Sequence, residues 1–336
     1  MAPHAVSQPV DTDSAPNAGP LDPERAGQLL QRLRRHVGTV FQGKAPVVDR
    51  ALTGLVAGGH LLIEDVPGVG KTLLAQALAI SVGLRFHRIQ FTSDLLPADI
   101  IGVNIFDQRS SEFVFKPGPV FANVILADEI NRTAPRTQSS LLEAMSEGQV
   151  SIEDVTHPLP RPFLVIATQN PLESHGTYPL PDSQLDRFLM RLAVGYPSRG
   201  VEREILLHRG QRNPVDDLQP VFDADTLIRL QATVDTVRFD ESLADYIMDI
   251  VEASRQSARL TLGVSTRGAL ALQRACRAQA LVQGRTFVTP DDVQQLAVPV
   301  LAHRIALGTG ETVVGSTRLA AEAVVQELVS RVPVPV

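Results

Sequence analysis

The sequence contains a single cysteine, Cys276, among 336 residues, so no disulfide can form within the chain. Nothing in this composition indicates an oxidising compartment. No apolar run approaches the roughly 18–20 residues that a helix needs to cross a membrane. The N-terminus also lacks the basic region and apolar core of a signal peptide. These absences lead us to expect a cytoplasmic protein without a membrane span.

The sequence also lacks an excess of positive charge. It has 31 Lys and Arg residues against 37 Asp and Glu residues, which gives a formal net charge of −6. This balance argues against a wholly basic nucleic-acid binder, although a local basic channel remains possible. The motifs His-Glu-x-x-His, Cys-x-x-Cys and Gly-x-Ser-x-Gly are absent. Composition is otherwise ordinary, with 44% hydrophobic residues, and the length allows two domains.

What the sequence does contain is the stretch "LLIEDVPGVGKTLLAQALA" from Leu61 to Ala79. Its apolar start predicts a short buried strand over Leu61–Glu64, and its breaker-free end favours a helix over Thr72–Val82. The glycines between them allow backbone N–H groups to turn toward an anion. The first N–H groups of a helix carry partial positive charge, so the stretch predicts a phosphate-binding turn.

Side chains in this turn strengthen the prediction of a nucleotide site. Lys71 can reach the outer phosphates, and the Thr72 hydroxyl can bind Mg²⁺. The P-loop pattern would place its first glycine where this chain has Asp65, but Pro67-Gly68 can supply the turn. The alternative is an ordinary strand–turn–helix with a chance lysine. We predict that ATP is bound here by Pro67, Gly68, Val69, Gly70, Lys71, Thr72 and Leu73.

Two acids follow a second apolar strand, in "NVILADEINR". Beside a P-loop we expect Asp128 to hold the Mg²⁺ shell together with Thr72, and Glu129 to activate water for attack on the γ-phosphate. The alternative is a strand that ends in a charged turn. A third strand ends at Asn170, whose amide can hydrogen-bond the attacking water or the γ-phosphate. An asparagine that begins a turn before Pro171 is the competing interpretation.

Two arginines complete the candidate site. Arg187 follows the P-loop strand at a long distance, and we expect it to point away from its own site toward a neighbour's. Its planar, permanently charged side chain suits phosphate. Arg267 lies in the first turn of a helix capped by Ser265, where a cation is unfavourable for the helix dipole. That placement indicates another role, such as phosphate contact. A plain surface charge is the alternative for each arginine.

Strands and helices alternate along the first two thirds of the chain. Residues 1–20 have no periodic apolar face and are predicted to be a disordered tail. Helices are expected after Asp22 and over Ala45–Val56, Thr72–Val82, Pro135–Glu147 and Asp182–Phe188. Strands are expected over Leu61–Glu64, Phe86–Gln90, Val124–Asp128, Phe163–Thr168 and Leu189–Val194. The alternation predicts an α/β fold with a parallel five-stranded sheet covered by helices on both faces.

Past Tyr196 the strand signals fade and helical periods follow. These are expected over Asp223–Val234, Glu241–Ser257, Thr266–Val282 and Pro290–Ile305. We predict a nucleotide-binding domain over residues 21–212 and a smaller all-helical lid domain over residues 213–336. The boundary is expected near residues 210–222, where Asn213-Pro214 and Gln219-Pro220 lie.

Two segments break the plain alternation of strands and helices. Gly102–Pro119 and Gly148–Pro160 each alternate apolar and polar residues around a turn, which predicts two β-hairpins. They are either surface hairpins or elements that project toward a substrate or a central pore.

Together these segments resemble the AAA+ ATPases, and more closely the MoxR family. The resemblance covers most of the chain, from about residue 35 to about residue 310. It rests on "GGHLLIEDVPGVGKT", "RIQFTSDLLPADIIG", "GPVFANVILADEINR", "TQSSLLEAMSEGQV", "ATQNPLESHGTYPLPDSQLDRF" and "STRGALALQRACRAQALVQGR". These motifs are long and occur in order, and the variant "EDVPGVGKT" is familiar in the family. The resemblance implies a Mg²⁺-dependent ATPase with a P-loop AAA+ fold.

The resemblance also implies roles by position. Residues at the catalytic centre are similar to Walker A (Lys71, Thr72), Walker B (Asp128, Glu129), sensor 1 (Asn170), sensor 2 (Arg267) and an arginine finger supplied in trans (Arg187). Gln90 corresponds to a residue that gates the catalytic glutamate. The adenine pocket is implied to begin at Val40, Phe41 and Gly43-Lys44. The two hairpins resemble the helix-2 insert and the hairpin before sensor 1.

The resemblance further implies a chaperone-like motor that matures or activates a client protein complex, often with a von Willebrand factor A domain partner. Because Arg187 would need a neighbour's phosphate, we expect a homo-oligomeric ring, a hexamer. A nucleic-acid translocase would need a basic, aromatic channel. The hairpins instead mix Arg109, Lys116 and phenylalanines with four acids, which disfavours nucleic acid as a ligand. A magnesium-chelatase-like subunit and a non-hydrolysing nucleotide switch are two further candidate functions, and Glu129 disfavours the switch.

Overall fold

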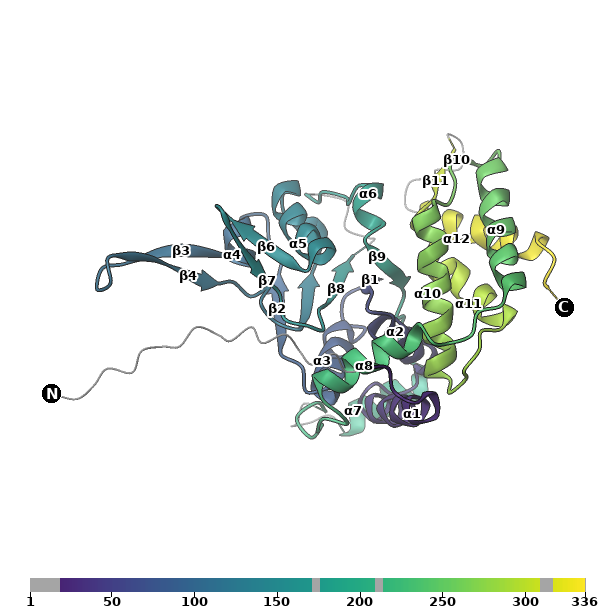
Figure 1. The fold of residues 1–336 in the computed structure, drawn as a ribbon, viewed down its shortest axis with the longest axis horizontal. Helices are drawn as coiled ribbons and strands as arrows, with labels where there is room; N and C mark the ends of the chain where they lie inside the picture. Colours follow the sequence, from purple (N-terminus) through teal and green to yellow (C-terminus); the bar gives the residue numbers. More distant parts are fainter. Residues whose placement is uncertain (1–18, 171–175, 209–213, 309–316, 336) are drawn as a thin grey trace.

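The computed structural model describes residues 19–170, 176–208, 214–308 and 317–335 (Figure 1). The predicted tail up to residue 18 lies outside these ranges. Pro171, which follows Asn170, lies outside them as well. Residues 210–213 also lie outside them, so the domain boundary predicted near residues 210–222 stays a prediction. In the described part of the chain, no helix has the length and apolar character to cross a membrane.

A five-stranded sheet forms the centre of the molecule. Its order is β2 (Phe86–Gln90), β5 (Val124–Asp128), β8 (Leu164–Gln169), β1 (His60–Glu64) and β9 (Phe188–Leu192). Every neighbouring pair is parallel, so the carboxyl ends of the strands meet along one edge of the sheet. The predicted parallel sheet is confirmed. Helix α6 (Asp182–Leu185) is shorter than expected because Phe188 already pairs with His60 as the first residue of β9.

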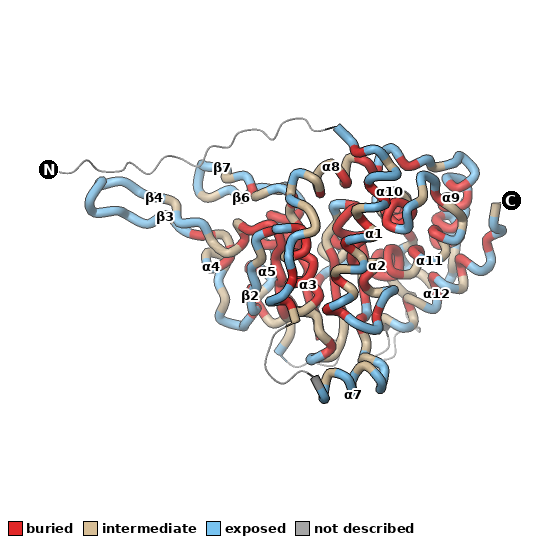
Figure 2. Tube along the Cα trace, turned by 90° about the horizontal axis from the view of Figure 1, so that it is seen from below, coloured by how far each residue is buried: buried red, intermediate tan, exposed pale blue. Residues whose placement is uncertain are grey.

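Helices cover both faces of this sheet, as side chains along one strand show. Leu61 and Ile63 of β1 point into a core that also contains helices α1 (Pro23–Val40), α2 (Ala45–Ala57) and α3 (Lys71–Ser81). Leu62, between them, points into a second core with helix α5 (Pro135–Glu147). This alternation follows from the two-residue period of a strand. The central strands β5, β8 and β1 are therefore buried on both sides, and Figure 2 shows buried segments gathered in the middle of the molecule.

Two hairpins extend from the face that carries α5, and both are confirmed. The first joins β3 (Gly102–Asp107) and β4 (Glu112–Pro117) after the short helix α4 (Pro97–Ile101). The second joins β6 (Gln149–Ile152) and β7 (Val155–Pro158). Figure 1 shows β3 and β4 projecting away from the body, at the end opposite the C-terminal helices. Gly118 closes the base of this hairpin, because a Cβ there would lie 2.3 Å from the Ile100 carbonyl oxygen.

The C-terminal part is mainly helical and packs beside β9. It follows α7 (Arg199–His208) and contains α8 (Ala224–Val234), α9 (Glu241–Gln256), α10 (Thr266–Val282), α11 (Pro290–Leu301) and α12 (Thr317–Arg331). A small antiparallel pair, β10 (Leu260–Leu262) and β11 (Ala306–Leu307), was not anticipated. The helix expected over Pro290–Ile305 ends at Leu301. Cys276 is fully buried in α10, and its burial raises the pKa of the thiol well above the ordinary value.

Candidate nucleotide-binding site

The loop between β1 and α3 has the backbone shape of a phosphate-binding turn. Gly68 and Gly70 have φ angles of 83° and 95°, a left-handed region that glycine adopts without strain. Gly70 caps α3, so the unpaired N–H groups of the first helical turn begin at Lys71. The Lys71 ammonium donates to the Asp65 carbonyl oxygen at 2.7 Å. Burial lowers the pKa of Lys71, and the carboxylate of Asp128 opposes that shift most strongly.

Asp65, which replaces the first glycine of the P-loop pattern, ties this loop to the segment after β9. Its Oδ2 accepts hydrogen bonds from the N–H groups of Val194 at 2.7 Å and Gly195 at 2.5 Å. The buried Lys44 ammonium binds the same segment by donating to the Val194 carbonyl oxygen at 2.9 Å. Asp65 therefore acts as a clamp between the loop and the segment after β9. The sequence did not predict this role, because Asp65 and Val194 are 129 residues apart in the chain.

The two acids lie where β5 ends, and one threonine of β8 holds both. The Thr168 hydroxyl donates to Asp128 Oδ1 at 2.6 Å and accepts from the Glu129 N–H at 2.9 Å. Glu129 has a φ of 57°, which is uncommon for a residue other than glycine and turns its side chain out of the strand direction. The remaining Asp128 oxygen, Oδ2, accepts from the Arg88 guanidinium of β2 at 2.6 Å.

The Glu129 carboxylate is itself held by side chains from β2 and from its own turn. Its Oε2 accepts from Gln90 Nε2 at 2.9 Å and pairs with Arg132 Nε at 3.0 Å. Arg88 donates to the amide oxygen of Gln90 at 3.1 Å, so the amide N–H group of Gln90 is turned toward Glu129. Sequence reasoning anticipated Gln90 but missed Arg88. The position of Arg88 two residues before Gln90 could have indicated its role, since residues two apart in a strand lie on the same face.

A cavity of about 470 Å³ brings most of the predicted residues together. It is lined by Pro67, Gly68, Gly70, Lys71, Thr72, Leu73, Gln76, Arg88, Gln90, Asp128, Glu129 and Asn170. The Thr72 hydroxyl and the Asp128 carboxylate are oxygen donors that suit Mg²⁺, which usually takes one or two carboxylates plus waters and phosphate oxygens. In the described ranges, no group of three His, Cys, Asp or Glu side chains is arranged to hold a metal by itself.

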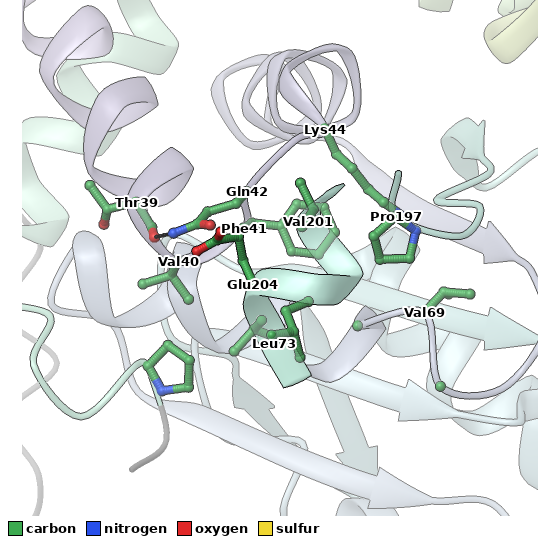
Figure 3. Close-up of a pocket in the computed structure, with 14 residues that line it drawn as sticks. Thr39, Val40, Phe41, Gln42, Lys44, Val69, Leu73, Pro197, Val201 and Glu204 are labelled. Carbon is green, nitrogen blue, oxygen red and sulfur yellow. Dashed lines mark hydrogen bonds between the residues drawn. The ribbon is translucent and has the colours of Figure 1, made fainter. Parts of the chain in front are cut away.

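A second cavity, of about 280 Å³, adjoins the loop and is mostly apolar (Figure 3). It shares Gly68, Gly70 and Leu73 with the first cavity, and its other lining residues include Val40, Phe41, Val69, Pro197, Val201 and Glu204. Apolar walls with a few polar groups at the rim suit a flat heterocyclic base. Helix α7 closes one side, and it approaches so near that a Cβ on Gly43 would lie 2.8 Å from Val201 Cγ2.

The two predicted arginines line neither cavity. Arg187 packs on α5, where it donates to the Leu142 carbonyl oxygen and to the Ser146 hydroxyl, the latter at 2.6 Å. Arg267 lies in the first turn of α10, and its side chain is 75% exposed and lies 3.5 Å from Asp186 Oδ2. Arg267 thus contacts the residue that precedes Arg187 in the chain, and neither arginine lines the cavity at the phosphate-binding loop.

Comparisons with known proteins agree with this geometry. Residues 60–190 match the family model described as "ATPase family associated with various cellular activities (AAA)", and residues 252–327 match the AAA lid domain. The chain is 48% identical over 308 residues to the uncharacterized protein YeaC of Bacillus subtilis, covering 92% of this chain and 95% of that one. It is 44% identical over 287 residues to the Mycobacterium tuberculosis protein named Chaperone MoxR1, covering 83% and 76%.

A solved structure agrees as well. A crystal structure of a candidate ATPase from Cytophaga hutchinsonii has a TM-score of 0.84 and 37% sequence identity, covering 94% of this chain and 97% of that one. Magnesium-chelatase subunits are more distant. One from Arabidopsis thaliana is 29% identical over 202 residues, which covers 57% of this chain and 46% of that protein.

Proposed function

Because the chain belongs to the MoxR family of AAA+ ATPases and so hydrolyses ATP, we propose that this hydrolysis drives the remodelling, maturation or activation of a client protein complex. One observation carries the catalytic part of the proposal. A single cavity is lined by the Lys71 ammonium, the Thr72 hydroxyl, the acids Asp128 and Glu129, and the Asn170 amide. This set is what phosphoryl transfer to water requires.

The proposed roles follow from the chemistry of each group. Lys71 and the first N–H groups of α3 bind the phosphates, and the apolar cavity at Val40 and Phe41 binds the base. Mg²⁺, held by Thr72 and Asp128, supplies charge stabilisation on the phosphate oxygens when bound. Glu129 accepts the proton of the attacking water, while Asn170 orients that water or the γ-phosphate. Gln90 sets the direction of the Glu129 carboxylate before ATP binds.

We place Arg187 and Arg267 at the nucleotide of a neighbouring subunit. Neither arginine lines a cavity described above, and Arg267 lies 3.5 Å from Asp186, the residue that precedes Arg187. An arginine supplied in trans requires a head-to-tail contact, and such contacts close into rings when the rotation allows. We propose a hexameric ring as the assembly. We also propose that the protein acts in the cytoplasm.

The β3–β4 hairpin is the proposed contact with the client. Phe106 and Phe113 pack edge to face near its tip, with ring centroids 5.3 Å apart, and are 50% and 72% exposed. Single exposed apolar residues are normal, but a projecting pair of aromatic rings indicates a contact surface. By resemblance to the family, the client complex includes a protein with a von Willebrand factor A domain.

ATPase measurements with and without nucleic acid test this proposal against a translocase. The net charge of −6 leads us to expect no stimulation by single-stranded or duplex DNA and only weak binding. Stimulation of several-fold, with binding that weakens steeply as salt rises, would replace the chaperone proposal by the translocase. Stimulation by a purified von Willebrand factor A domain protein is the positive result. Dependence of a metal-insertion reaction on the protein would instead favour a chelatase role.

A further inference from the structure

A buried arginine just after α11, Arg304, directs most of its hydrogen bonds to the segment around Arg187, and its Nη1 also donates to the Val300 carbonyl oxygen of α11. Arg304 is 7% exposed. Its Nη2 donates to the Phe188 carbonyl oxygen at 2.7 Å and to that of Asp186 at 3.2 Å. Its Nη1 donates to the Leu189 carbonyl oxygen at 3.1 Å. Arg304 therefore binds the backbone carbonyl groups of the residues on both sides of Arg187.

The Asp186 side chain contacts both Arg304 and the second predicted arginine, Arg267. Its Oδ1 accepts from Arg304 Nε at 2.8 Å, and its Oδ2 lies 3.5 Å from Arg267 Nη1. The start of α10 also lies close to the stem of Arg304, since a Cβ on Gly268 would be 3.2 Å from Arg304 Cδ. Three segments distant in sequence, the start of β9, the start of α10 and the turn after α11, thus meet at the Arg304 side chain.

A purely structural role explains this arrangement poorly. Burying a charged side chain is costly, and well-packed apolar residues of similar volume often stabilise a protein as well or better. Burial lowers the pKa of Arg304, while Asp186 opposes that shift. What a guanidinium adds over an apolar side chain is geometry, because its planar fork fixes several acceptors at once. The acceptors fixed here are the neighbours of Arg187.

We propose that Arg304 is a positioning residue that holds Arg187 and Arg267 as one unit joined to the lid. The inference rests on the proposed action of both arginines in trans. Arg187, at the start of β9, and Arg267, at the start of α10, then keep a fixed position relative to each other at the neighbouring subunit's nucleotide. A displacement of about 1 Å at a catalytic group can lower the rate by about 10²-fold. Loss of the Arg304 hydrogen bonds should therefore lower kcat rather than the affinity for ATP.

The test uses Arg304→Lys in the full-length oligomer, with Arg285→Lys as the matched control. Arg285 is also a lid arginine paired with a buried aspartate, Asp292, at 2.6 Å, but this pair lies at the N-terminal end of α11, whereas Arg304 follows its C-terminal end. Arg304→Lys is expected to lower kcat by about 10²-fold with KM for ATP unchanged. Arg285→Lys is expected to lower the melting temperature and leave kcat unchanged. Asp186→Asn, which keeps the backbone and side-chain shape, serves if Arg304→Lys fails to fold.

Mixing separates a positioning effect from damage to the subunit's own site. Arg304→Lys still holds ATP but presents displaced arginines, whereas Lys71→Ala presents intact arginines but cannot hold ATP. Mixed oligomers are expected to recover activity, and the same recovery is expected of mixtures of Arg187→Ala with Lys71→Ala. Normal kcat in Arg304→Lys, or loss without recovery where the Arg187→Ala mixture recovers, overturns the role of Arg304. If Arg187→Ala itself keeps normal turnover or shows no recovery, the proposed action in trans fails instead.

Discussion

At the scale of single residues, the candidate site divides its work between groups that bind ATP and groups that act on water. Lys71 is the first residue of α3, directly after the loop that receives the phosphates. Glu129 lines the same cavity, with its carboxylate held by Gln90 and its backbone N–H by Thr168. Affinity for ATP and turnover should therefore respond to different substitutions.

Lys71→Ala is expected to abolish ATP binding, whereas Glu129→Gln is expected to bind ATP and barely hydrolyse it. The lysine neutralises phosphate charge, but the glutamine amide cannot accept a proton from water. Fluorescence titration with a nucleotide analogue and a phosphate-release assay measure the two effects. Normal hydrolysis by Glu129→Gln would falsify the role assigned to this acid.

Asp65→Ala is expected to raise KM for ATP by about tenfold, which corresponds to about 1.4 kcal/mol. The N–H groups of Val194 and Gly195 lose their acceptor, so the segment that leads into the base cavity is no longer held. Asp49→Ala is the control, because Asp49 is also a partly buried carboxylate that accepts two hydrogen bonds, from Arg34 on α1, but lines neither cavity. Equal KM in the two variants would contradict the clamp.

The short motifs of the site could be predicted from sequence because their chemistry is local. Gly68, Gly70, Lys71 and the acids lie within a few residues of a strand end, where a sheet gathers side chains. The roles of Asp65 and Arg304 could not be predicted, since their partners lie more than 100 residues away in the chain. A single charged residue in a sequence does not indicate which distant residue it will contact.

At the scale of elements, strands were the easier prediction and boundaries the harder one. The apolar runs of β5 and β8 are buried on both faces, so they have few alternatives. The expected helix over Asp182–Phe188 was too long because the pairing of Phe188 with β1 prevails over local helix preference. The β10–β11 pair is equally non-local, as it joins segments more than 40 residues apart.

His60 makes the fit between β1, β8 and α5 sensitive to pH. Its Nδ1 accepts from the Val165 N–H at 3.0 Å, which requires the neutral ring, and burial lowers the pKa of His60 to about 4. The unfolded chain binds this proton near pH 6.5, so the free energy of unfolding should fall between pH 6.5 and 4, by on the order of 1–3 kcal/mol. Urea denaturation across this range should give a flatter profile for His60→Gln; identical profiles would exclude His60 as the cause.

The β3–β4 hairpin allows packing and client contact to be separated within one strand. Phe115 stacks on His157, with ring centroids 4.0 Å apart, and packs against Phe121, whereas Phe113 is 72% exposed. Phe115→Ala should destabilise the protein by about 1–3 kcal/mol. Phe113→Ser should leave stability within about 0.5 kcal/mol but reduce stimulation of the ATPase by the client. Undiminished stimulation in Phe113→Ser would remove the hairpin tip from the client contact.

At the scale of the whole molecule, activity should depend on assembly. If Arg187 acts on a neighbour's nucleotide, ATPase activity per subunit should fall on dilution in parallel with dissociation of the oligomer. Arginines supplied in trans contribute about 10³–10⁵-fold to kcat in related reactions, so the dissociated subunit should be almost inactive. Sedimentation and ATPase assays over the same concentrations measure both curves. Constant activity through dissociation would show that each subunit is complete alone.

The burial of Cys276 makes the molecule well suited to site-specific labelling. Its thiol is inaccessible, and its raised pKa keeps it protonated near neutral pH. A new cysteine at an exposed position such as Ser110, in the turn of the projecting hairpin, would then react with a maleimide dye in preference to the native thiol. Native Cys276 therefore need not be replaced before a fluorophore or spin probe at the hairpin tip reports its movement during ATP turnover.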